Sequence, residues 1–280
     1  RHSGSKAAVM IPGWLCLRMA GSLSLIVVIG LSATIYSSPA QPGTCPLPSH
    51  HAGVTFPVEQ IEAHWACRLE PIISRHTTAN KLGPLRTPLP QVAYLYLLDH
   101  PPMAASLVNR LGIAPYQSEI RGPGRYWGND GEGTAGTVEL VYQDRTSRVY
   151  YLEGSHDSRF LHHITGKAVV LLRMNQVTDV NGVEAMDSTL ISYTRLDNRL
   201  LSGIVSLLRP LTGSAVTRKL AKGVDSVNRL SQVMRQQPDR VLSEATKPSA
   251  LSSDEMAFLK HTLEDLSHSS SATQSRTSSP

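Results

Sequence analysis

Residues 167–194 read KAVVLLRMNQVTDVNGVEAMDSTLISYT, and this stretch decides the fold class. Residues 167–174 are apolar on both faces, as in a strand that is covered on both sides, with charges at Lys167 and Arg173. Residues 189–194 alternate apolar and polar side chains, which is the pattern of a strand with one buried face. Between them, Asn181-Gly182 supplies the two positive-φ positions of a type I′ turn. The stretch therefore predicts a long antiparallel β-hairpin.

Segments with strand character also precede this hairpin. Residues 137–142 alternate, and residues 148–153 are rich in β-branched and aromatic side chains. A further strand is expected to end near Trp127. Because five or six strands follow one another without a helical segment between them, we predict an antiparallel meander.

A glycine-rich stretch, GRYWGNDGEGTAG at residues 124–136, places Asn129, Asp130 and Glu132 between glycines. A helix-flanked calcium loop needs oxygen ligands at alternate positions and a closing bidentate acid at the twelfth. Here Asn129 and Asp130 are adjacent and residues 134–137 contain no carboxylate. We therefore predict a turn between two strands and no metal site.

Helical patterns lie on both sides of the strands. Residues 58–73 and 91–111 repeat apolar side chains at helical spacing, the second with an interruption at His100-Pro101-Pro102. A polar, proline-containing loop is expected between them, at residues 83–90. After the strands, an apolar segment from Asp197 to Pro210 precedes a longer amphipathic helix.

The apolar stripe of that longer helix runs from Val216 to Met234. The predicted fold class is therefore α+β, an antiparallel β-meander of five to six strands covered by C-terminal amphipathic helices. Residues 91–243 would form this domain and residues 41–90 an irregular and helical N-terminal extension. Residues 244–280 are expected to be a mostly disordered Ser/Thr-rich tail. Its one short helix, 254–266, would begin at a capping box of Ser252 and Glu255.

The N-terminal region indicates export. Residues 19–36 carry no charge and follow Arg18. Their apolar centre, 23–35, has the length of a signal-peptide core, and Ser38 and Ala40 are small residues of the kind that a signal peptidase requires. A cleaved signal within residues 1–40 and a retained anchor formed by residues 19–36 both remain open. In either case the rest of the chain is expected in a periplasmic or extracellular location.

Export bears on the cysteines. Cys16 lies in the signal region, which leaves Cys45 and Cys67. In an oxidising compartment these two predict one disulfide, with two unpaired thiols as the alternative.

The basic character of the chain is concentrated in two segments, residues 1–40 and residues 195–240. Residues 1–40 contribute +3 of the formal net charge of +5, and the remainder carries 24 basic and 22 acidic residues. This balance argues against a nucleic-acid partner. Residues 195–240 hold nine basic and three acidic residues. The basic face of the helix there is either solvated or able to approach an anionic membrane surface.

Candidate catalytic and metal-binding residues form no convincing pattern. Ser155, His156 and Asp157 are consecutive, whereas a hydrolase triad needs groups that converge from separate elements. His162 and His163 would point to opposite faces of an extended segment, so at most one could join a metal site. We predict a solvated loop, with no cofactor, metal site or catalytic residue.

Arg173 lies inside a strand that is otherwise apolar. Either the strand emerges into water there, or Arg173 faces an internal cavity and holds a carboxylate or phosphate headgroup, with Glu153 as a possible protein partner instead. Four aromatic residues could line the same cavity or could be ordinary core residues: Trp127, Tyr142, Tyr151 and Tyr193.

The order of elements resembles the helix-grip fold of the START-like superfamily, which includes polyketide cyclases and lipid-transfer proteins. The resemblance covers residues 97–236 and is carried by LLDHPPMAASLVNRLGIAPY at 97–116 and TRLDNRLLSGIVSLLRPL at 194–211. It implies a long helix that closes over a bent sheet to form a tunnel for an apolar ligand. A periplasmic lipid-carrier half-barrel is the other architecture that would suit export.

The leading functional hypothesis is therefore that the chain binds or transfers a hydrophobic small molecule or lipid. The first alternative is an exported hydrolase or cyclase that uses Arg173 with His156 or Tyr151. It requires these groups to meet at a pocket. A second alternative is a membrane-associated structural factor without a ligand.

Overall fold

The computed structural model describes residues 45–157, 163–179, 182–197, 205–248 and 251–277. The predicted signal or anchor segment, Cys16, His162 and Asn181 lie outside the described residues. None of the described helices is long and apolar enough to span a membrane.

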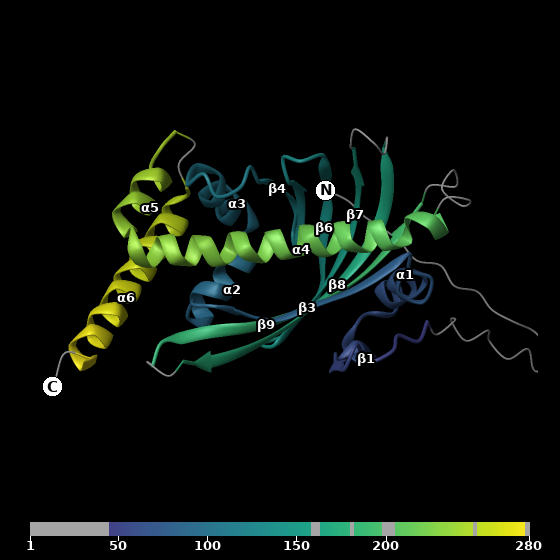
Figure 1. Cartoon of the computed structure of the whole chain (residues 1–280), viewed down its shortest axis with the longest axis horizontal. Helices are drawn as coiled ribbons and strands as arrows, with labels where there is room; N and C mark the ends of the chain where they lie inside the picture. The colour runs from purple at the N-terminus through teal and green to yellow at the C-terminus, as the bar shows by residue number, and fades with distance from the viewer. Residues whose placement is uncertain (1–44, 158–162, 180–181, 198–204, 249–250, 278–280) are drawn as a thin grey trace, which may run out of the picture. The chain divides into compact units, whose positions relative to one another are not determined.

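One antiparallel sheet dominates the described part of the chain (Figure 1). Within that part it has seven strands in the order β3-β9-β8-β7-β6-β5-β4. The strands are β3 (Thr78–Thr87), β4 (Gln117–Gly122), β5 (Arg125–Asn129), β6 (Thr134–Gln143), β7 (Ser147–His156), β8 (Ile164–Thr178) and β9 (Glu184–Leu196). β4 to β9 form the predicted meander, and β8 and β9 pair from Thr178–Glu184 to Gly166–Leu196 as the predicted hairpin. The α+β class is confirmed, with more strands than expected.

The additional strand is β3, which the sequence predicted in part as the loop at 83–90. It pairs with β9 at an edge of the sheet and contains a register shift between Leu82 and Leu85, at Gly83-Pro84. A proline has no N–H to donate to a ladder and is tolerated at an edge strand or a bulge. Proline content therefore disguised a strand that has an edge position and a bulge.

Helices surround the sheet. They are η1 (Val58–Gln60), α1 (Ala63–Ser74), α2 (Gln91–Asp99), α3 (Pro101–Arg110), α4 (Val205–Gln236), α5 (Pro238–Ala245) and α6 (Ser253–Thr277), and a short hairpin of β1 (His50–His51) and β2 (Val54–Thr55) precedes them. The break between α2 and α3 falls at His100, as predicted from the prolines. Cys45 and Cys67 form a disulfide that ties the lead-in to α1.

Two helices are longer than the sequence indicated. α4 continues through Pro210, where a break was expected, although a proline in the second turn of a helix removes one backbone hydrogen bond. α6 begins at the predicted capping box, where the Glu255 side chain accepts a hydrogen bond from the Ser252 N–H at 2.9 Å. Its backbone is helical to Thr277, beyond the predicted end at residue 266.

The two faces of the sheet bury separate cores. Two consecutive residues of β8, one on each face, identify the core on each side. Leu171 packs with Leu69 and Ile72 of α1, and we call this side the α1 face. Leu172 packs in a larger cluster with Leu230 and Met234 of α4, on the α4 face. Since side chains alternate along a strand, the parity of a residue in β7, β8 or β9 assigns it to one face.

Candidate functional site

The sheet bends toward the α4 face along a row of glycines. Gly128 pairs with Gly136, Gly136 with Gly154, and Gly154 with Gly166, so four neighbouring strands carry a glycine at the same level. A Cβ placed on Gly154 would lie 2.4 Å from the Ala135 carbonyl oxygen and 2.9 Å from the Gly136 Cα. The strands therefore approach each other on this side more closely than any side chain would allow.

α4 lies in the hollow that this bend creates. Thr217 donates a hydrogen bond to Asn80 of β3 at 2.8 Å, and Lys219 forms an ion pair with Asp130 in the β5–β6 loop. In a flat sheet β3 and β5 would be about 24 Å apart, at about 4.8 Å per strand, whereas a helix with its side chains is about 10–12 Å wide. One turn of α4 can reach both only because the sheet wraps around it.

The hollow is filled at one end. Tyr94 and Leu97 of α2, Leu107 of α3, and Leu230 and Met234 of α4 are buried there against the sheet. The Tyr94 hydroxyl is 2.8 Å from the Ser188 hydroxyl, so the polar end of this ring is satisfied within the core. This end is a packed core rather than a binding site.

Toward the glycine row the α4 face is less completely packed. Four apolar side chains of the sheet are half-buried there and belong to neither core of the described residues: Val138, Leu140, Leu152 and Val170. The apolar stripe of α4 has the same property at Val216, Leu220 and Val224. Apolar surface is thus left partly accessible both on the sheet and on α4.

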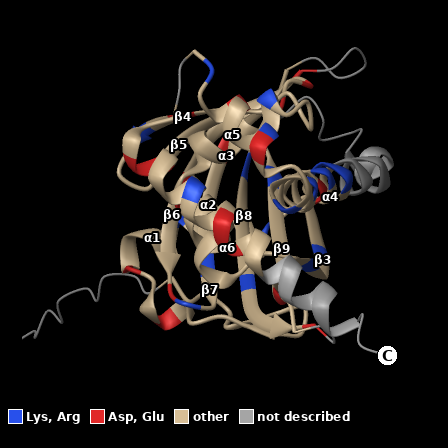
Figure 2. Cartoon of the chain, turned by 90° about the vertical axis from the view of Figure 1, so that its left-hand side faces the viewer, with Lys and Arg blue, Asp and Glu red and all other residues tan. Residues whose placement is uncertain are grey.

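An ion-pair cluster, which we call the latch, joins α4 to the β5–β6 loop. Lys219 contacts both Asp130 and Glu132, the second at 3.3 Å, and Lys222 also pairs with Glu132. Burial opposes ionisation of Asp130, but hydrogen bonds from Lys219 and the Thr134 and Glu132 N–H groups outweigh it and lower its pKa. In Figure 2, Lys and Arg positions are marked in blue along the described part of α4. The glycine-rich stretch at residues 124–136 thus forms ion pairs with two lysines of α4.

The five residues predicted to bind a ligand all lie on the other side of the sheet. Tyr142, Tyr151 and Tyr193 pack in or against the core under α1. Burial raises the pKa of Tyr151, as does a hydrogen bond from its hydroxyl to Glu153 at 2.8 Å. The structure therefore brings these three together as aromatic residues of a core.

Arg173 and Trp127 lie on the same α1 face but apart from that group. Arg173 is half-buried and donates a hydrogen bond to the Ser147 hydroxyl at 2.7 Å. Trp127 lines a shallow groove of about 390 Å³ over the glycine row, with the Arg121 guanidinium 6.0 Å from its ring. The assignment of the five residues to a ligand stays a prediction.

The groups proposed for an enzyme do not converge. Arg173 pairs with Ser147 at one end of the β7–β8 ladder and His156 with Ile164 at the other, about 30 Å apart at about 3.3 Å per residue. His156 lies on the α4 face, where its ring is 3.0 Å from the Thr134 hydroxyl. Tyr151 faces α1. These three residues form no catalytic constellation.

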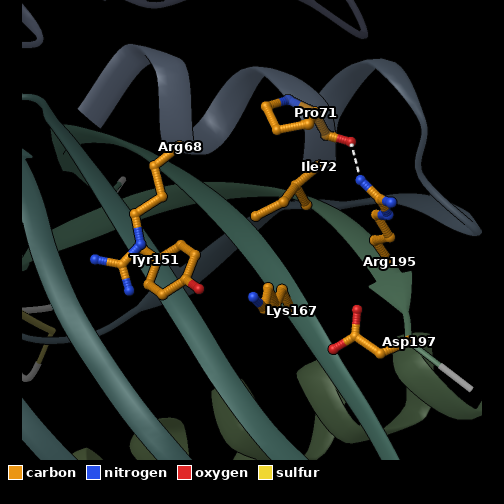
Figure 3. A pocket seen from close by; sticks show the side chains of 7 residues that line it. All are labelled: Arg68, Pro71, Ile72, Tyr151, Lys167, Arg195 and Asp197. Atoms are coloured by element: carbon orange, nitrogen blue, oxygen red, sulfur yellow. Dashed lines mark hydrogen bonds between the residues drawn. The ribbon is translucent and has the colours of Figure 1, made fainter. Parts of the chain in front are cut away.

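A pocket of about 320 Å³ opens between α1 and the sheet (Figure 3). It is lined by Arg68, Pro71, Ile72, Tyr151, Lys167, Arg195 and Asp197. Of these, Tyr151 was predicted from the sequence as a ligand-binding residue. Lys167 and Arg195 stand opposite each other in neighbouring strands, and the sequence offers no signal that a helix 100 residues away in the chain, at Arg68, would join them.

The chain matches no protein-family model, and no curated protein matches it. Solved structures do match over part of it. A conserved protein from Geobacillus kaustophilus is 9% identical, with a TM-score of 0.34 over 46% of this chain and 89% of that one. An uncharacterized protein from Rhizobium leguminosarum is 13% identical, with a TM-score of 0.34 over 55% and 97%. Ara h 8.0201 is 13% identical, with a TM-score of 0.30 over 55% and 99%. Scores at this level assign no family.

Proposed function

We propose that this protein binds or transfers a hydrophobic small molecule or lipid between the bent sheet and α4. The observation that supports this is the incomplete packing of the α4 face: apolar side chains of the sheet and of the α4 stripe stay half-buried there. Membership of the START-like helix-grip superfamily is the finer part of the proposal. A sheet with a long helix lying across it fits the order of elements on which that resemblance rests.

An apolar ligand would complete this packing. Burial of apolar surface contributes about 25 cal/mol per Å², so covering these half-buried side chains favours a bound state. None of the five residues predicted to bind a ligand is on this wall. Val138, Leu140, Leu152 and Val170 take that place.

Native mass spectrometry after gentle purification tests the proposal, together with titration by the neutral apolar probe N-phenyl-1-naphthylamine. We expect a co-purified mass and probe binding. The near-isosteric polar double variant Val170→Thr/Leu152→Asn should weaken probe binding about ten-fold, since it removes about 1.4 kcal/mol or more of apolar contact. Val92→Thr, at a residue of α2 that is 72% exposed, is the matched control and should bind as the parent does. A clean apo mass with no probe binding would overturn the proposal.

We further propose that the protein is exported. The uncharged residues 19–36 support this, as does the disulfide, which is rare in reducing compartments. The intact mass of the protein from its native host tests export, because a chain that begins near Gln41 has lost its signal. A retained segment would instead favour membrane anchoring.

A further inference from the structure

We propose that the pocket under α1, on the face of the sheet opposite α4, is a binding site for a phosphate monoester group. This site is separate from the hydrophobic site of the proposed function, and nothing in the comparisons assigns it. Its charged side chains come from α1, from β8, from β9 and from Asp197, which directly follows β9. Figure 3 shows them around the pocket.

The wall of the pocket has an excess of positive charge. In the described part of the chain it carries three cations, Arg68, Lys167 and Arg195, and one carboxylate, Asp197. With Glu153, which lies 3.9 Å from Arg68 and 3.7 Å from Lys167, the cluster keeps an excess of one positive charge, and an anion that displaces Glu153 from these two cations meets an excess of two. A phosphate monoester, which carries about −1.5 to −2 at pH 7, gains more from this charge than a monovalent carboxylate does.

The Arg195 guanidinium has N–H groups available for a ligand. One of its terminal nitrogens donates to the Pro71 carbonyl oxygen at 3.2 Å, which holds the guanidinium at the rim under α1. Among the described residues no carboxylate pairs with it. A guanidinium that is positioned through one N–H and keeps the others available is suited to a bidentate contact with phosphate.

Arg68 and Lys167 are also positioned without being fully neutralised. The Arg68 guanidinium lies 4.1 Å from the Tyr151 ring and 4.8 Å from the Trp65 ring, so cation–π contacts fix its place. Both cations share Glu153, at 3.9 Å from Arg68 and 3.7 Å from Lys167. Exposed pairs at such distances contribute about 0–1 kcal/mol, so a phosphate can compete for either cation.

The size of the pocket limits the ligand. A volume of about 320 Å³ is at the low end of the range of about 300–1,000 Å³ for small-molecule sites. It accommodates a phosphate with a small organic substituent against Ile72 and Tyr151. A small soluble phosphomonoester and the headgroup of a phosphomonoester lipid share this chemistry.

Titration calorimetry in phosphate-free buffer at low ionic strength tests the site with phenyl phosphate, inorganic phosphate and benzoate. Phenyl phosphate should bind, and benzoate should bind more weakly. The variant Lys167→Gln/Arg195→Gln should weaken binding at least ten-fold. The control Arg229→Gln/Lys260→Gln, which removes the same charge from exposed positions of α4 and α6, should not.

Because the variant Lys167→Gln/Arg195→Gln could lose binding by misfolding, a second variant is chosen that should bind phenyl phosphate more tightly. Asp197→Asn removes the carboxylate of the wall and should tighten phenyl phosphate binding about two- to five-fold. Val170→Thr/Leu152→Asn, at the hydrophobic site, should leave it unchanged, so the two sites can fail separately.

Sedimentation with phosphatidylcholine vesicles that contain or lack phosphatidic acid distinguishes a soluble phosphomonoester from a lipid headgroup as the ligand. Binding of phenyl phosphate without pelleting on either kind of vesicle indicates a soluble ligand. Pelleting only with phosphatidic acid, and only when Lys167 and Arg195 are present, indicates a lipid headgroup. The proposal is overturned if no phosphate probe or vesicle binds, if benzoate binds more tightly than phenyl phosphate, or if both double variants lose binding equally.

Discussion

His51 shows how a single buried side chain can make the protein sensitive to acid. It is 1% exposed, packs edge-on against Phe56 and Tyr193, and its Nδ1 is 3.0 Å from the Tyr193 hydroxyl oxygen. Burial lowers the pKa of His51. As the pH falls below about 6.5, the ordinary histidine value, the unfolded chain takes up a proton that the native state does not.

We therefore expect the free energy of unfolding to decrease as the pH decreases through this range. The contribution of His51 to this decrease is at most about 1.4 kcal/mol per pH unit. His51→Gln, which cannot be protonated, should flatten the dependence between about pH 7 and pH 5. His268→Gln, at an exposed position of α6, should not. Urea unfolding across this range measures the slopes, and equal slopes for parent and His51→Gln would contradict the assignment.

Gly154 is the residue on which the bend of the sheet depends most directly. Because its Cβ would meet the backbone of β6, Gly154→Ala should destabilise the protein by about 1–3 kcal/mol through overpacking. Gly223 of α4 is the control, since a Cβ there meets nothing within 4 Å. Gly223→Ala should stabilise by up to about 1 kcal/mol through helix propensity. Urea unfolding separates the two, and a neutral Gly154→Ala would show that the row does not impose the bend.

At the scale of elements, α4 is held from two sides that differ in chemistry. Hydrogen bonds from Thr217 to Asn80 and from Thr87 to Asn228 fasten it to β3. The latch fastens it to the β5–β6 loop through charge alone. Since charge pairs at partly exposed positions are screened by salt, the loop side is the one that can open.

We expect Asp130→Asn/Glu132→Gln to speed hydrogen exchange in the middle of α4 and to speed release of an apolar probe. Asp225→Asn removes an ion pair internal to α4 and should do neither. The pKa of Glu132 is lowered by Lys222 and Lys219, and that of Asp130 lies below its usual value. The contribution of the latch is therefore present above about pH 4 and is lost as the pH falls through the lowered values. Unchanged exchange in the variant would mean that the latch does not hold α4.

At the scale of the whole molecule, one sheet supports two unlike layers. The α4 face buries the larger core and the α1 face a smaller one that includes the lead-in residue Phe56. The Cys45–Cys67 bridge, which spans 22 positions, ties this lead-in to α1. The disulfide therefore lies on the side of the smaller core.

Reduction of this disulfide should lower the free energy of unfolding by about 3 kcal/mol, mainly by restoring chain entropy to the unfolded state. Urea unfolding with and without reductant measures the difference. Cys45→Ala/Cys67→Ala should resemble the reduced parent and should not respond to reductant. An unchanged unfolding midpoint on reduction of the parent would contradict the expected contribution.

Local chemistry in the sequence was sufficient for several elements. The β8–β9 hairpin followed from alternation and Asn181-Gly182, the α2–α3 break from prolines, and the start of α6 from Ser252 and Glu255, because each depends on neighbours in the chain. β3 was missed because its edge position and bulge make Gly83 and Pro84 acceptable, and both are set by β9.

The site was decided by tertiary structure. The sequence determined an antiparallel α+β protein with an apolar stripe on a long C-terminal helix, since periodicity encodes which residues share a face. It did not determine which face meets that helix. Tyr151 and Tyr193, at odd positions of β7 and β9, face α1, whereas Tyr150 and Leu152 of β7 and Val170 of β8, at even positions, face α4. Whether the odd or the even positions of the strands face α4 is decided only when the sheet packs against that helix. The cations of the α1 pocket likewise come together only when α1 packs across β8 and β9.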